Sequence, residues 1–84
     1  MNTKIIRGIM LSLLRAGQPM PEDALVEATQ LACRPDQPLP EDVIDKMKNL
    51  ASEGFITGAT DELTRERFWE LTSVKGVIRA RQLR

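Results

Sequence analysis

Few residues in this chain can do acid–base or nucleophilic chemistry. Histidine is absent, so the commonest general base and the commonest protein ligand for metals are both missing. Without histidine no Ser–His or Cys–His pair can form, and no glycine-rich phosphate-binding loop occurs in the sequence. The single cysteine, Cys33, has no base near it in the sequence, and we interpret it as an ordinary half-buried thiol. We expect no enzymatic activity, no bound metal and no cofactor.

Adjacent acidic residues are the other pattern that could indicate catalysis. They stand at Glu22–Asp23, Glu41–Asp42 and Asp61–Glu62. The first two pairs fall at expected helix starts, where acids interact favourably with the positive end of the helix dipole. The third falls in a polar turn, where aspartate is a common residue. We therefore assign these acids to local structure and not to catalysis or metal binding.

Charge is unevenly distributed along the chain, although the net charge is zero. Residues 1–20 contain three bases and no acid, residues 21–62 contain three bases and ten acids, and residues 63–84 contain six bases and two acids. Such asymmetry indicates a basic surface for a polyanion such as nucleic acid. The alternative interpretation is that each segment only forms a solvated face of the domain.

The spacing of apolar residues predicts the elements that position these charges. Helices are expected over 3–16, 21–32 and 41–53, strands over 55–59 and 67–72, and a last helix after Thr72, which would cap it. Thr3 is expected to cap the first helix and Gly17 to end it. Gly8, in the middle of that helix, predicts close packing against another helix.

The stretch from Pro40 to Ile56 (PEDVIDKMKNLASEGFI) joins the third helix to a strand. Gly54 stands at the junction, where glycine can take the left-handed conformation that closes a helix. Trp69 is expected in the core, because aromatic side chains of small domains mostly pack there, and stacking on a nucleic-acid base is the alternative. The apolar stripe of the last helix is expected at Val74, Val77 and Ile78.

The element order and two short motifs resemble those of winged-helix proteins. NLASEGFI stands where that family has xLxxxGxI, and FWELT stands where it has an aromatic residue followed by x-LT. The resemblance covers residues 3–78 and is to the small bacterial and phage transcription regulators of this superfamily. It implies a mainly α fold with a small β-hairpin: a three-helix core, a wing and a C-terminal helix in a single domain over 1–84. The segment LTSVKG departs from the family's LTxxG by one residue, which affects the geometry of the last helix.

The resemblance implies DNA binding, in which the third helix enters the major groove and the hairpin reaches the adjacent phosphates. Carried over to this sequence, the contacts would come from the third helix, the hairpin and the last helix. The candidate DNA-binding residues are Lys46, Lys48, Asn49, Ser52, Arg65, Arg67, Lys75 and Arg79. Asp42 and Asp45 fall on the same exposed face of the third helix and would repel DNA. The alternative function is therefore a protein-interaction or dimerisation module that does not bind DNA.

The expected partners are DNA, a second copy of the chain or another protein. A homodimer is expected through the first helix, the last helix or both, because the first helix carries a double apolar row that so small a chain is not expected to cover fully. No apolar run approaches the roughly 20 residues that a membrane span needs, and no small-molecule ligand is evident. We interpret the basic and apolar start as a helix and not as a signal peptide. The lone cysteine fits a reducing cytoplasm.

Overall fold

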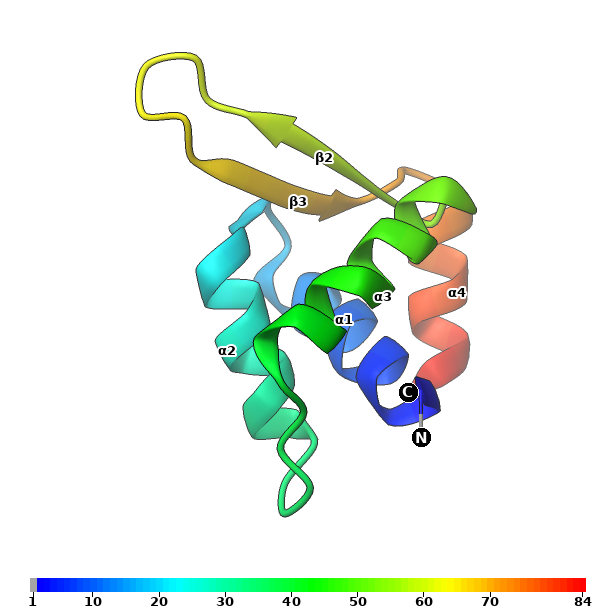
Figure 1. Cartoon of the computed structure of the whole chain (residues 1–84). Coiled ribbons are helices and arrows are strands. Elements are labelled where there is room, and N and C mark those ends of the chain that lie inside the picture. The colour runs from blue at the N-terminus through cyan, green and yellow to red at the C-terminus, as the bar shows by residue number, and fades with distance from the viewer. Residues whose placement is uncertain (1) are drawn as a thin grey trace.

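Four helices and three strands make up the computed structural model of the protein, which describes residues 2–84 (Figure 1). In chain order they are α1 (Asn2–Ala16), β1 (Met20–Pro21), α2 (Glu22–Ala32), α3 (Pro40–Ser52), β2 (Ile56–Thr60), β3 (Arg67–Leu71) and α4 (Lys75–Leu83). The strands form one antiparallel sheet in the order β1-β3-β2. The helices predicted over 3–16, 21–32 and 41–53 and the strands predicted over 55–59 and 67–72 are confirmed to within one residue at each end. No helix within residues 2–84 is long and apolar enough to cross a membrane.

Helix α1 lies at the centre of the core, and α2, α3 and α4 all pack against it. Its apolar rows face inwards, with Ile9, Met10 and Leu13 no more than 2% exposed. On its α2 side, a Cβ atom added at Gly8 would lie 3.0 Å from Thr29 Cγ2, so the close helix packing predicted at this glycine is confirmed. The double apolar row that suggested a dimer contact is therefore largely covered within one chain.

The two ends of α1 differ in how well the sequence predicted them. Gly17 ends the helix as expected, with a φ of +65° and its N–H donated to the Leu13 carbonyl at 3.2 Å. Thr3 lies inside the first turn instead of before it, so the capping role predicted for Thr3 is wrong.

Helix α3 packs Met47 and Leu50 into the same core and then passes directly into β2. At its end Gly54 has a φ of +83°, and the N–H groups of Gly54 and Phe55 donate to the carbonyls of Ala51 and Leu50. This pair of hydrogen bonds is the Schellman motif that glycine commonly forms after a helix. The left-handed glycine predicted at this junction is confirmed.

The sheet places one face of β3 against the helices and the other away from them. Trp69 pairs with Met20 on β1 and with Gly58 on β2. It is 2% exposed, which confirms its predicted core position. A Cβ atom at Gly58 would come within 3.0 Å of the Trp69 ring, so glycine leaves the space that the ring occupies. Phe68 is half-buried and Glu70 is exposed on the opposite face, as strand alternation requires.

Helix α4 meets the core through a different face from the one predicted. Its buried residues are Gly76 and Ala80. Of the three residues expected in the apolar stripe, Val74 and Ile78 are 66% and 53% exposed, and Val77 is half-buried. Val74 and not Thr72 is the N-cap residue, although the Thr72 hydroxyl accepts a hydrogen bond from the Gly76 N–H at 2.8 Å. The small side chains at 76 and 80 let the backbone of α4 approach closely, and this turns the larger side chains outwards.

Thr29, at the contact between α1 and α2, is fully buried, and its Oγ1 has no hydrogen-bond partner in the described part of the chain. Valine has the same branched shape without the hydroxyl. We expect Thr29→Val to raise the free energy of unfolding by about 1 kcal/mol, because it removes an uncompensated buried polar group. Chemical denaturation followed by circular dichroism measures the change. Thr29→Ser, which keeps the hydroxyl and removes the methyl group facing Gly8, should destabilise the protein, and a destabilised valine variant would contradict the expectation.

Candidate nucleic-acid interface

The outward face of α3 carries the residues predicted to read DNA. Lys48, Asn49 and Ser52 are exposed, together with both aspartates, Asp42 and Asp45. Lys46 is half-buried on one flank. The centre of the face therefore presents carboxylates and an amide, while the two lysines stand at its sides.

A shallow depression beside α3 brings several predicted site residues together. Lys46, Asn49 and Ser52 line it with Ile6 of α1. An adjoining depression of 580 Å³ shares Ile6, Leu50 and Glu53 with it, and the α4 residues that line it include Lys75 and Arg79. The structure thus brings five of the predicted residues to two adjoining depressions, whereas Lys48, Arg65 and Arg67 line neither of them.

Lys75 already has partners within the protein. Its Nζ donates to the carbonyl oxygen of Glu53 at 2.6 Å and lies 4.8 Å from the centre of the Phe55 ring. A cation at this position satisfies an unpaired carbonyl at the C-terminal end of α3 and interacts favourably with the helix dipole. The sequence analysis did not predict this role, which joins α4 to the end of α3.

The loop between β2 and β3 is held in shape by Asp61. Its Oδ1 accepts hydrogen bonds from the backbone N–H groups of Leu63 at 2.8 Å and Thr64 at 3.1 Å. These bonds lower the pKa of the Asp61 carboxyl, which keeps it ionised and capping the turn. Arg65 follows in the left-handed region, with a φ of +64°, and its side chain is exposed at the end of the hairpin. Leu63 beside it is 94% exposed.

Arg67 at the start of β3 lies over the ring of Trp69, with its guanidinium carbon 5.1 Å from the ring centre. The indole Nε1 of Trp69 donates to Glu22 Oε1 at 3.0 Å. These contacts connect the hairpin to the start of α2. Burial of the ring excludes the alternative in which Trp69 stacks on a nucleic-acid base.

Acids outnumber bases on both elements that would face DNA. Helix α3 carries three acids and two bases, and the loop over residues 61–66 carries three acids and the single base Arg65. Repulsion from these carboxylates opposes a phosphate backbone at close range. The attraction of the predicted basic residues for phosphates is therefore opposed by the negative charges beside them.

A basic surface that the site prediction missed lies between α1 and α2. Lys4, Arg7, Arg15 and Arg34 line a groove there. The signal was present in the sequence, because the first 20 residues hold three bases and no acid. The spacing of Lys4, Arg7 and Arg15 places these three side chains along one side of α1.

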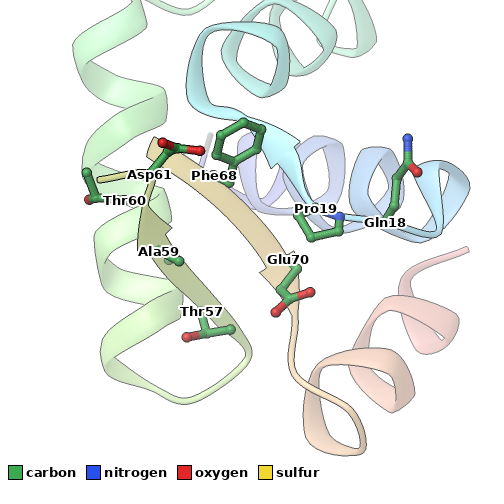
Figure 2. Close-up of a pocket in the computed structure, with 9 residues that line it drawn as sticks. Gln18, Pro19, Thr57, Ala59, Thr60, Asp61, Phe68 and Glu70 are labelled. Carbon is green, nitrogen blue, oxygen red and sulfur yellow. The ribbon is translucent and has the colours of Figure 1, made fainter. Parts of the chain in front are cut away.

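The outer face of the sheet carries a groove of a different character, with a volume of 620 Å³ (Figure 2). Phe68 and Ala59 contribute apolar surface, and Pro19 closes one side. Asp61 and Glu70 lie at opposite ends of it along the strands. No base is among its lining residues in the described chain, so this groove does not suit a phosphate.

Cys33 is buried, with 3% of its surface exposed, and not half-buried as expected. Its Sγ lies 3.5 Å from the Lys4 carbonyl oxygen. Burial raises the pKa of the thiol and outweighs the opposing effect of the Lys4 charge, so the reactive thiolate is disfavoured. Within residues 2–84 no three His, Cys, Asp or Glu residues gather closely enough to hold a metal ion.

Comparison of the chain with models of protein families, with curated proteins and with solved structures finds no match. Function is therefore inferred from the geometry and charge of this chain alone.

Proposed function

We propose that this chain is a winged-helix domain that binds double-stranded DNA and acts as a small transcription regulator of bacterial or phage type. The observation that supports the proposal is the arrangement of its elements: three helices around one core, with the β2–β3 hairpin starting at the C-terminal end of α3 and its loop projecting away from the helices (Figure 1). In this arrangement α3 faces the major groove, and the hairpin brings Arg65 and Arg67 to the neighbouring phosphates.

The charges on α3 predict an unusual balance of contacts. Asp45 stands near the centre of the outward face and repels the phosphates, so α3 adds less affinity than the hairpin does. Asn49, one turn further on, has the amide group that pairs well with adenine. Arg79 on α4 is exposed and adds a phosphate contact at the side of α3.

Titration of a fluorescent random-sequence duplex at about 50 mM salt tests the proposal. We expect binding in the range of about 1–100 μM, as for nonspecific DNA contacts, with an affinity that falls as salt rises. The double variant Arg65→Asn/Arg67→Gln should lower the salt slope by about 2, because each lost phosphate contact removes about one unit. Asparagine suits the left-handed backbone at position 65, so the change there removes the charge of Arg65 without adding backbone strain.

Asp45→Asn should bind the same duplex more tightly, because it removes a repelling charge from the α3 face. Glu70→Gln is the matched control, since Glu70 is also exposed but lies on the outer face of the sheet, away from α3. Equal affinities of these two variants would remove α3 from the interface. Absence of binding by the wild type at about 50 μM protein would contradict the proposal as a whole.

The second candidate function is a protein-interaction module that uses the same fold without DNA. The exposed side chains of Val74, the N-cap residue of α4, and Ile78, four positions further on, favour it, because neighbouring exposed apolar side chains are typical of contact sites. They also form the remaining surface for the expected homodimer, since the apolar rows of α1 are packed inside the chain. An acidic α3 face would then suit a basic partner.

A further inference from the structure

The groove between α1 and α2 is lined by four bases. Lys4, Arg7 and Arg15 project from α1 and Arg34 from the segment after α2, around a volume of 260 Å³. No acid is among the lining residues of the groove. The surface is therefore electrostatically suited to an anion, in contrast to the α3 face.

The helix packing explains why this groove exists. Gly8 allows α2 to approach α1 closely, and Leu11 beside it is 9% exposed although it lies outside the main core cluster. The floor of the groove is thus a close contact between two helices. Long basic side chains around it keep their charged ends in solvent.

The contacts that these bases already make leave most of their donors available. Lys4 Nζ lies 3.9 Å from Asp36 Oδ2, but both side chains are largely exposed, and such surface pairs contribute little. Arg7 donates its Nε–H to the Leu83 carbonyl at 2.9 Å, which uses one of its five donors.

The length of the basic row indicates the kind of anion that fits. Lys4 and Arg15 are eleven residues apart, so they stand about 16 Å from each other along α1. A small anion would contact only part of this row. A DNA strand carries a phosphate about every 3.4 Å along the duplex axis. A duplex lying along α1 can therefore place a phosphate near each basic side chain of the row.

The groove and α3 lie on different sides of α1. Leu13, which packs into the core with α3, is nine residues from Lys4 and therefore about 180° away around the helix. Figure 1 shows α3 crossing in front of α1, on the core side. One straight duplex therefore does not reach both surfaces of a single chain.

We infer that the α1–α2 groove is a second binding surface for a nucleic-acid backbone, so that one chain holds two duplex segments on opposite sides. The inference rests on the proposed function for the nature of the polyanion, duplex DNA, but not for the position of the contact. The groove reads no sequence, because its contacts are charges directed at phosphates.

The test uses two short duplexes of about 12 base pairs, roughly 40 Å long, one carrying a donor fluorophore and the other an acceptor. The wild-type chain should bring them together and give energy transfer that disappears at high salt. Arg15→Gln/Arg34→Gln should abolish energy transfer while still binding one duplex. Arg65→Asn/Arg67→Gln also removes two positive charges, but from the hairpin, and is therefore the matched variant for the other surface.

Each result supports or overturns the inference. Energy transfer unchanged in Arg15→Gln/Arg34→Gln would overturn it, and would show that two duplexes meet through a dimer or through the hairpin side alone. If this variant loses all binding while the hairpin variant binds as the wild type does, the groove stands and the α3–hairpin proposal fails. Absence of any duplex binding by the folded wild type overturns both, and binding of an acidic protein at the groove in that case assigns it to a protein partner.

Discussion

Replacing Gly76 with alanine is expected to destabilise the protein by about 3 kcal/mol, because the new side chain has no space. A Cβ atom at this position would overlap the carbonyl oxygen of Phe55 and lie 2.8 Å from Thr72 Oγ1. The first of these is backbone, which cannot rotate away as a side chain does. Relief requires α4 to move off the end of α3, which breaks the hydrogen bond from the Gly76 N–H to Thr72. Thermal and chemical denaturation measure the loss.

Gly17→Ala is the matched control for this prediction. Gly17 has a φ of +65° and nothing within 4 Å of an added Cβ atom, so alanine there meets backbone strain without a clash. We expect a loss of about 1–2 kcal/mol for Gly17→Ala. A Gly76→Ala variant as stable as the wild type would show that α4 docks more loosely than the structure indicates.

Most of the backbone of this fold was predictable from local patterns. The apolar periodicity of α1 and α3 and the glycines at positions 17 and 54 fixed where each helix ends. Alternation along RFWEL assigned Trp69 to the core and Glu70 to solvent. These predictions succeed because helix ends and strand faces depend on neighbours in the sequence.

The orientation of α4 was not predictable in the same way. A search for large apolar side chains selects Val74 and Ile78, yet the buried positions are Gly76 and Ala80. Close approach of a backbone favours the smallest residues, and they give no hydrophobic signal. The docking partner of Gly76 is the Phe55 carbonyl, which lies 21 positions earlier in the chain. Only the folded structure reveals that contact.

In the candidate site too, some features follow from local sequence patterns, while others depend on contacts between different elements. Exposure of Lys48, Asn49 and Arg65 follows from the helix period and the turn sequence. The contact of Lys75 with Glu53 and that of Arg67 with Trp69 join residues from different elements, and their charges looked equally available in the sequence. The groove between α1 and α2 likewise needs the packing at Gly8 to bring Arg34 beside α1.

Trp69→Ala is expected to cost about 3–5 kcal/mol of unfolding free energy, as large-to-small changes at buried aromatic positions do. The ring fills the space under Gly58, supports the guanidinium of Arg67 and donates to Glu22. Loss of the ring therefore removes the packing of the hairpin on the core and its hydrogen bond to α2 together. We therefore expect the hairpin to lose its fixed orientation before the helices unfold. Circular dichroism follows helix unfolding, and hydrogen exchange at the β2–β3 amides reports the hairpin.

Two variants separate the parts of this effect. Trp69→Phe keeps an aromatic ring but not the N–H, and Glu22→Gln keeps the ring but weakens the charge-assisted hydrogen bond at 3.0 Å. Because that bond is partly exposed, Glu22→Gln should cost about 1 kcal/mol, and Trp69→Phe should fall between it and Trp69→Ala. A cost for Trp69→Ala below about 2 kcal/mol would contradict full burial of the ring. Amides of β2 and β3 that stay protected in Trp69→Ala would show that backbone pairing alone holds the hairpin in place. Arg65 and Arg67 would then keep their positions without the tryptophan.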